Sequence, residues 1–247
     1  MVVGLALLVV LVLTERTAAH PIMPLRLFAS RQRVGAYLTR MLYLGAMIGF
    51  FYFTTQYLQS VLGFSAFVAG LAFLLMTVVN FAVAVAIPRL TRRFGQALPL
   101  TVGVALTLLG FLWLGLLEPG SGYWTAVAAP MLLIGAGQGL AFAPLTSAGI
   151  AGVATSDAGA ASGLVNTFHQ VGMAVGLGVL VTASAHSGAG LAGPAAVLTA
   201  QVGTAFDVGA LLLAAALVVV VTLLVPAAGR GYTAVEARPA PKEMMSS

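Results

Sequence analysis

The sequence predicts an all-α polytopic membrane protein with six complete transmembrane helices and part of another helix at its N-terminal end. The chain is 60% hydrophobic and only 7% charged, with a mean hydropathy of +1.06. An average soluble domain is about 45–50% apolar and about 25% charged. Uncharged stretches such as 41–88 far exceed the roughly 20 residues that one membrane helix needs. Helices are expected because an isolated strand leaves its backbone groups unsatisfied in lipid.

Glycine, proline and polar residues divide the apolar sequence into spans. Gly63 and Ser65 mark the turn after the first span, Pro119 and Gly120 end the third, and Pro226 ends the sixth. The six spans are predicted over 37–58, 66–87, 98–117, 123–148, 163–185 and 205–225. A loop rich in glycine and alanine is expected over 186–201, between the last two spans.

Four segments are predicted along the chain. The apolar segment 1–14 is short for a full span and has no basic residue before it, so we interpret it as the end of a helix. A signal peptide or an interfacial segment is the alternative. Residues 15–36 are predicted to be a cytoplasmic linker, and 37–226 a six-helix transmembrane bundle. Residues 227–247 are polar and contain proline, so a disordered cytoplasmic tail is expected.

The basic residues predict the orientation of the spans. Short cytoplasmic loops collect Lys and Arg, and alternation of six spans places every basic residue on one side. These residues are Arg16, Arg26, Arg31, Arg33, Arg40, Arg89, Arg92, Arg93, Arg230, Arg238 and Lys242. The C-terminus is therefore predicted to be cytoplasmic, with Arg89, Arg92, Arg93 and Gly95 in a tight cytoplasmic loop. Arg40 is expected to reach back to the cytoplasmic surface along its aliphatic stem.

Several function classes are disfavoured. The chain has no cysteine, which excludes disulfides, thiolate metal sites and cysteine nucleophiles. No Ser/His/Asp set, metal-ligand cluster or phosphate-binding loop is visible, so we expect no catalytic residue, no metal, no cofactor and no enzyme. The positive-inside rule explains the basic residues behind the net charge of +5, so no nucleic-acid partner is expected.

Paired glycines predict close helix packing. The G-x-x-x-G spacing occurs at Gly45/Gly49 and also in the later spans, where it lets helix backbones approach in lipid. The helix-packing candidates are Gly135, Gly139, Gly163, Gly172 and Gly176. Some of these glycines are also candidates for the sliding surface of a moving helix.

Polar and aromatic residues at membrane depth are the candidates for a substrate cavity, because such polar groups usually face a cavity or another helix. The candidates are Tyr43, Gln56, Asn80, Gln138, Asn166, His169 and Gln170. Hydrogen bonds between helices are the alternative role for the polar ones. Asp207 is expected to cap the N-terminus of the sixth span, with a titrating carboxylate in the transport path as the alternative.

Four stretches resemble one transporter family. They are "HPIMPLRLFASR" (20–31), "FTTQYLQSVLGFSAFVAGLAFL" (53–74), "GAGQGLAFAP" (135–144) and "GAASGLVNTFHQVGMAVGLGVL" (159–180). Together they resemble, in the same order, the C-terminal half of fourteen-span drug:proton antiporters of the major facilitator superfamily. "PRLTRRFG" (88–95) is similar to the short cytoplasmic loop motif of that superfamily but lacks its acidic residue, which would lie near Thr91.

The resemblance implies one half of a major facilitator bundle, made of two inverted three-helix repeats. It implies proton-coupled efflux of amphipathic drugs or small organic compounds across the cell membrane by alternating access. The partners would be the lipid bilayer, the substrates, protons, and a missing N-terminal half or a second copy of the chain. A non-transporting assembly module or an inactive truncated product is the alternative function.

Overall fold

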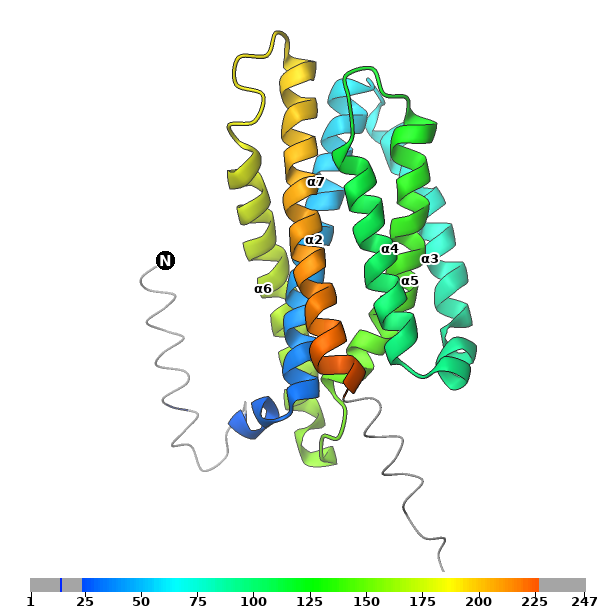
Figure 1. The fold of residues 1–247 in the computed structure, drawn as a ribbon, viewed down its shortest axis with the longest axis vertical. Coiled ribbons are helices and arrows are strands. Elements are labelled where there is room, and N and C mark those ends of the chain that lie inside the picture. The colour runs from blue at the N-terminus through cyan, green and yellow to red at the C-terminus, as the bar shows by residue number, and fades with distance from the viewer. Residues whose placement is uncertain (1–13, 15–23, 227–247) are drawn as a thin grey trace, which may run out of the picture.

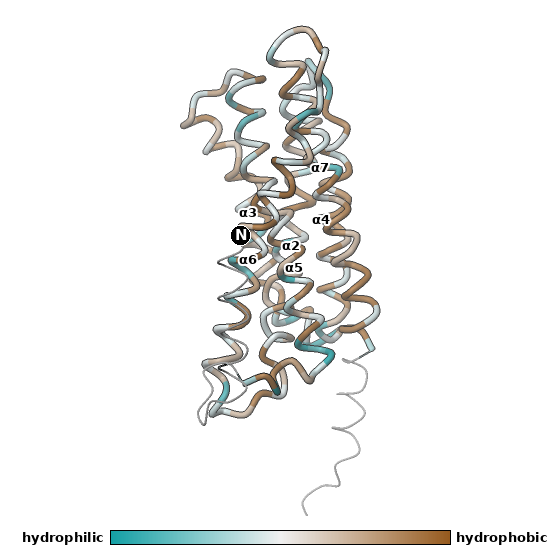
Figure 2. Tube along the Cα trace, turned by 90° about the vertical axis from the view of Figure 1, so that its left-hand side faces the viewer, coloured by the Kyte–Doolittle hydropathy of each residue, from teal (hydrophilic) through white to brown (hydrophobic). Residues whose placement is uncertain are grey.

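The computed structural model describes Thr14 and residues 24–226 (Figure 1). The described residues form no strand. Their long helices are α2 (Arg31–Gln56), α3 (Ala66–Phe94), α4 (Ala97–Gly115), α5 (Ala129–Gly149), α6 (Ala158–Ser184) and α7 (Pro194–Val219). With their π-helical extensions, six helices are long and apolar enough to cross a membrane. Apolar residues follow these helices along most of their length (Figure 2). The predicted fold of a multi-span helical membrane protein is confirmed.

Short helical segments extend or precede the long helices. The π-helical turns η2 (Tyr57–Val61) and η5 (Val220–Leu224) continue α2 and α7, and η3 (Trp124–Ala128) precedes α5. The 3₁₀ turns η1 (Leu25–Ala29) and η4 (Thr155–Asp157) precede α2 and α6. The predicted partial helix over 1–14, apart from Thr14, and the predicted tail over 227–247 lie outside the described residues.

The first helix begins earlier than predicted. It starts at Arg31 rather than residue 37, so the end of the predicted linker is helical. Ser30 explains the start, because its side-chain oxygen accepts a hydrogen bond from the backbone N–H of Arg33 at 3.4 Å.

The predicted loop of arginines is helical instead. The second span was expected to end at residue 87, before Pro88, but α3 continues through Pro88 to Phe94. Arg89, Arg92 and Arg93 therefore lie on the last turns of α3. The turn itself is only Gly95 and Gln96, and Gly95 has a φ of +74°, which favours glycine.

The last two spans also begin before their predicted starts. Helix α6 starts at Ala158 rather than residue 163, and α7 starts at Pro194 rather than residue 205. Half of the predicted loop over 186–201 is therefore the first part of α7. Asp207 lies well inside α7 beside Gly115, near the end of α4, so it does not cap a helix N-terminus.

The helix neighbours form a two-fold pattern. Helix α2 packs on α6 and α7, while α5 packs on α3 and α4; α4 meets α7, and α2 meets α5. Exchanging α2 with α5, α3 with α6 and α4 with α7 leaves this set of neighbours unchanged. The exchange relates a first group, α2, α3 and α4, to a second group, α5, α6 and α7. Since each group holds three spans, the second group enters the membrane from the opposite side. This pattern fits two inverted three-helix repeats.

Glycines allow the closest crossings between these groups. A Cβ atom added at Gly45 would lie 3.2 Å from the Cα of Gly176. One added at Gly135 would lie 2.5 Å from the carbonyl oxygen of Met76. The first helix of each group thus uses a glycine pair, Gly45/Gly49 or Gly135/Gly139, against the second helix of the other group.

The predicted packing glycines Gly172 and Gly163 differ from each other in their contacts. Gly172 lies against the backbone of Met41 on α2, so it belongs to the α2–α6 crossing. In contrast, a Cβ atom at Gly163 would meet no described atom within 4 Å. Gly163 therefore meets no other described helix, and its packing role stays a prediction.

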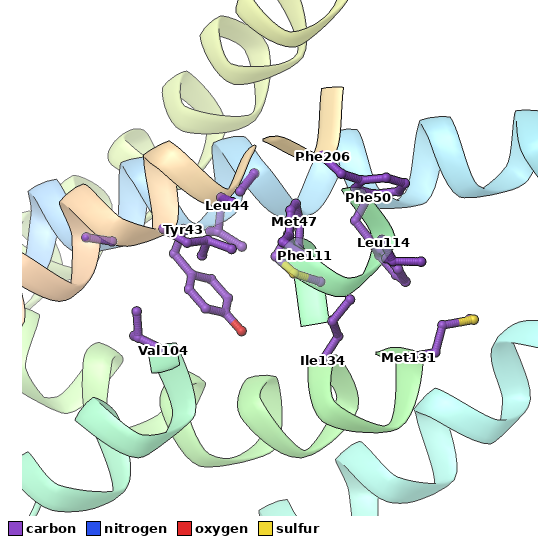
Figure 3. Packing of buried hydrophobic residues seen from close by; sticks show 14 of the residues in the cluster. Tyr43, Leu44, Met47, Phe50, Val104, Phe111, Leu114, Met131, Ile134 and Phe206 are labelled. Carbon is purple, nitrogen blue, oxygen red and sulfur yellow. The ribbon is translucent and has the colours of Figure 1, made fainter. Parts of the chain in front are cut away.

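An aromatic cluster fills the core between α2, α4 and α7 (Figure 3). The ring centroids of Phe50 and Phe111 are 6.1 Å apart, and those of Phe111 and Phe206 are 5.6 Å apart. All three side chains are almost fully buried. The spans that contain α3 and α6 are the least enclosed, and α3 is the least buried of the six.

The α2–α6 crossing yields a test of packing. Gly176→Ala should destabilise the bundle by about 1–3 kcal/mol, because the new methyl group overlaps the backbone of Gly45 and forces the helices apart. Gly178→Ala is the matched control, since its Cβ would meet nothing within 4 Å. Alanine should there be neutral or stabilising by up to about 1 kcal/mol. Thermal unfolding of both variants in detergent measures the difference, and equal midpoints would contradict the packing role.

Candidate functional site

A hollow of about 290 Å³ lies between α3 and α5. It is lined by Asn80, Ala84, Gln138, Gly139, Phe142 and Ala143. Gly139 explains why two predicted cavity residues meet here. Its position permits α5 to approach the backbone of Asn80 closely, since an added Cβ would lie 2.7 Å from the Asn80 carbonyl oxygen. The side chains of Asn80 and Gln138 make no hydrogen bond to any other described residue. Both amides are therefore available to a ligand.

Phe142 joins this hollow to a charged cluster. Its side chain lines the hollow and is 39% exposed. The guanidinium carbon of Arg40 lies 4.6 Å from the centre of the Phe142 ring, in cation–π geometry. The His169 ring lies edge-on to Phe142, with a centroid separation of 6.4 Å. The cluster thus combines residues of α2, α5 and α6.

Arg40 is enclosed rather than extended to the surface. It is only 6% exposed, which corrects the expectation that it reaches back to the cytoplasmic side. Its Nη1 donates a hydrogen bond to Thr146 Oγ1 at 2.8 Å, and its Nη2 lies 3.3 Å from His169 Nδ1. These contacts across α5 and α6 hold the guanidinium inside the bundle.

The hydrogen-bond partners define the protonation of His169. A guanidinium has donors only, so Nδ1 of His169 must accept the bond from Arg40. The imidazole is then neutral, with its proton on Nε2. The Thr146 hydroxyl donates to the carbonyl oxygen of Phe142 at 2.9 Å, which leaves its oxygen free to accept from Arg40. Every partner of Arg40 is therefore uncharged.

The structure separates Tyr43 from the other predicted cavity residues. Its side chain is 1% exposed and packs in the core (Figure 3). Its hydroxyl lies 2.9 Å from Thr107 Oγ1 on α4. Since Thr107 donates to the carbonyl oxygen of Gly103, Tyr43 is the donor to Thr107. Tyr43 joins α2 to α4 and is not among the residues that line the hollow.

The remaining candidates do not line the hollow. Asn166 and Gln170 are exposed on α6, on either side of His169 along the chain. Gln56 is half-buried at the end of α2 and is not among the residues that line the hollow. Sequence reasoning missed Phe142 and Thr146. Their signal is the four-residue spacing of Gln138, Phe142 and Thr146, which places all three on one face of α5.

The loop-motif residues Arg89, Arg92 and Arg93 are exposed and form no ion pair with a described residue. An ion pair instead links η1 to η4, where Arg26 donates to both carboxylate oxygens of Asp157 at 3.0 and 2.8 Å. This hydrogen bonding, with the charge of Asp157, raises the pKa of Arg26 above its ordinary value, and partial desolvation opposes the shift. The pair fastens the segment before α2 to the start of α6.

The fold and this site define a multi-span membrane protein with a mostly apolar hollow between its helices that carries two amide side chains. Residues 1–177 match the family model of the Major Facilitator Superfamily. This match covers most of the sequence, and the chain belongs to that superfamily, whose members are transporters rather than enzymes.

Named relatives include several export and resistance proteins. The chain is 39% identical to the cephamycin export protein of Amycolatopsis lactamdurans, over 92% of this chain and 46% of the relative. It is 35% identical to a puromycin resistance protein of Streptomyces alboniger, over 88% of this chain and 46% of the relative. A multidrug efflux pump of Mycolicibacterium smegmatis is 29% identical over 78% of this chain and 38% of the pump. The chain thus spans about half the length of the relatives it matches.

The position of Tyr43 yields a test that separates a core role from a cavity role. Tyr43→Phe should lower the stability by about 1 kcal/mol, because it removes a buried hydrogen bond without changing the packing of the ring. Tyr52→Phe is the control, since Tyr52 is 41% exposed and its hydroxyl bonds to no described residue. Thermal unfolding measures both. A stable Tyr43→Phe variant with weakened substrate binding would contradict the core role.

Proposed function

We propose that this chain is the C-terminal half of a proton-coupled transporter that exports amphipathic drugs or small organic compounds by alternating access. The observation that carries the proposal is the pair of unpartnered amides, Asn80 and Gln138, in a hollow at membrane depth. Polar groups in a membrane helix are retained where they serve a pathway or another helix. The export and resistance functions named for the relatives support the same conclusion.

The substrate cavity proposed here uses Asn80, Gln138 and His169 at its inner wall. Asn166 and Gln170 belong to the same cavity, because they project from α6 next to His169 and are exposed. Gln56 is proposed to act nearer the outer end of α2. Such cavities bind mainly by apolar contact with a few polar anchors, which suits amphipathic compounds.

The other half of the transporter is proposed to cover α3 and α6. Helix α3 exposes large apolar side chains, among them Phe67 at 75% and Phe81 at 70%. Helix α6 exposes Gly159 and Gly163, beside which no described atom would contact an added Cβ. A missing N-terminal half is the proposed cover, and a second copy of the chain is the alternative.

The C-terminus is proposed to be cytoplasmic, and the coupling ion is proposed to be a proton. Arg89, Arg92 and Arg93 support a cytoplasmic end of α3, and alternation of six spans then supports a cytoplasmic C-terminus. The transporter lies in the cell membrane, and lipid surrounds α4 and α7. No described carboxylate lines the hollow, so we propose that the acidic residue for proton coupling belongs to the other half.

A fusion experiment tests the function. The first half of the cephamycin export protein, joined to this chain, should restore drug export in a drug-sensitive bacterial host. The chain alone serves as the comparison. Loss of export when the proton gradient is collapsed would support proton coupling. A fusion that inserts in the membrane but exports none of several chemically different drugs would favour the alternative, a non-transporting assembly module or inactive product.

The hollow predicts which residues set substrate affinity. Asn80→Ala and Gln138→Ala in the active fusion should each raise the half-saturating substrate concentration by about fivefold, since each removes one polar anchor worth about 1 kcal/mol. Gln201→Ala is the control, because Gln201 bonds to the carbonyl oxygen of Ala185 near the start of α7. Concentration series of export measure the effect. Unchanged values for both hollow variants would remove this site from the substrate path.

A further inference from the structure

We propose that Arg40 is the binding site for a carboxylate, and that the substrates of this transporter include amphipathic carboxylates. This inference rests on the proposed export function and names the chemical class of its substrate. It is carried by a buried guanidinium whose partners are all neutral. The aromatic ring that covers this guanidinium belongs to Phe142, which also lines the open hollow.

The charge of Arg40 lacks a counter-charge among the described residues. The described carboxylates belong to Glu118, Asp157 and Asp207. Asp157 is paired with Arg26. Glu118 and Asp207 lie at the end of the bundle where α4 finishes, whereas Arg40 contacts the opposite end of α5. A guanidinium cannot lose its proton in a protein, and an unpaired buried charge is strongly unfavourable. A bound anion would remove that penalty.

The free donors of Arg40 suit a carboxylate. A guanidinium carries five N–H groups in a planar fork. One is used by Thr146 and one by His169, while Nε is buried and has no partner in the described chain. A carboxylate accepts two parallel N–H bonds from such a fork. The free Nε–H and a remaining Nη–H provide that pair of donors.

Phe142 controls access from the hollow. Its ring covers the guanidinium, yet the side chain is 39% exposed and lines the hollow that holds Asn80 and Gln138. Rotation of Phe142 about χ1 would open the guanidinium to a ligand in the hollow. The ligand's apolar body would then lie against Phe142 and Ala84, while its carboxylate would meet Arg40. This arrangement selects an amphipathic anion.

Two sources can supply the carboxylate. One is a substrate in the hollow, which we propose. The other is an acidic side chain of the transporter's second half, in which case Arg40 would join the two halves. The chemistry at Arg40 is the same for both, so the experiment must separate them.

Equilibrium binding to the 247-residue chain in lipid nanodiscs tests the anion site. The probes are naphthoate and its neutral analogue naphthamide. The chain should bind naphthoate roughly tenfold or more tightly, as expected for a charge-assisted pair of hydrogen bonds. Arg40→Gln should remove this preference and leave naphthamide binding unchanged. Arg89→Gln, at an exposed arginine of α3, is the control and should keep the preference.

Two further variants keep the test decisive if Arg40→Gln unfolds. Arg40→Lys retains the charge but loses the fork, so it should lower the preference without removing naphthoate binding. Phe142→Ala uncovers the guanidinium and should strengthen naphthoate binding relative to naphthamide. Equal binding of the two probes to the unaltered chain, or a folded Arg40→Gln variant that keeps the preference, would overturn the proposal.

Export by the fusion separates the remaining outcomes. A substrate carboxylate predicts that Arg40→Gln loses export of naphthoate while export of naphthamide persists. Loss of both, with naphthoate bound by the isolated chain but not by the fusion, would assign the carboxylate to the other half and overturn the substrate class. Equal export of both probes by active Arg40→Gln would overturn the anion site and leave the export function standing. A fusion that exports nothing, beside selective binding in nanodiscs, would refute the export function alone.

Discussion

The crossing of α2 and α6 at Gly45 and Gly176 is the contact on which the rest of the bundle depends. In lipid, apolar side chains gain little by leaving their surroundings, so helices associate through close van der Waals contact. The absence of a side chain at Gly45, Gly172 and Gly176 lets these two backbones meet. This crossing brings His169 to Arg40, and the equivalent crossing of α5 with α3 brings Gln138 to Asn80. Both polar features of the site thus follow from glycine contacts.

The number of spans could be predicted from the sequence because hydrophobic length is set by the bilayer. Their ends were harder to predict. Helix α3 passes through Pro88 because a proline removes one hydrogen bond without necessarily ending a helix. Helix α7 starts at Pro194 because a helix can extend beyond the apolar region, where composition no longer marks it. The error at Asp207 followed from this early start.

The candidate site was predicted only in part. Asn80 and Gln138 are polar residues in apolar helices, and this contrast is visible in the sequence. Tyr43 also stands out as a residue with a polar group in an apolar helix. The direction of its side chain, however, depends on the packing of α2 against α4, and its hydroxyl bonds to Thr107. Burial of Arg40 depends on Phe142 and Thr146, more than 100 positions later in the chain. Single-residue patterns do not contain such pairings.

The exchange pattern of the helices has a mechanical consequence. Helices α3 and α6 lie at opposite edges of the bundle, and each is fastened to the first helix of the other group by backbone contact at glycine. Backbone crossings have no rotamers to change, so a force on one edge reaches the other without being absorbed by side chains. The six helices should therefore turn as one lever. Bending should then occur in the connections between helices, such as the two-residue turn at Gly95 and Gln96. Relative movement should occur at the surfaces that this bundle presents to its surroundings.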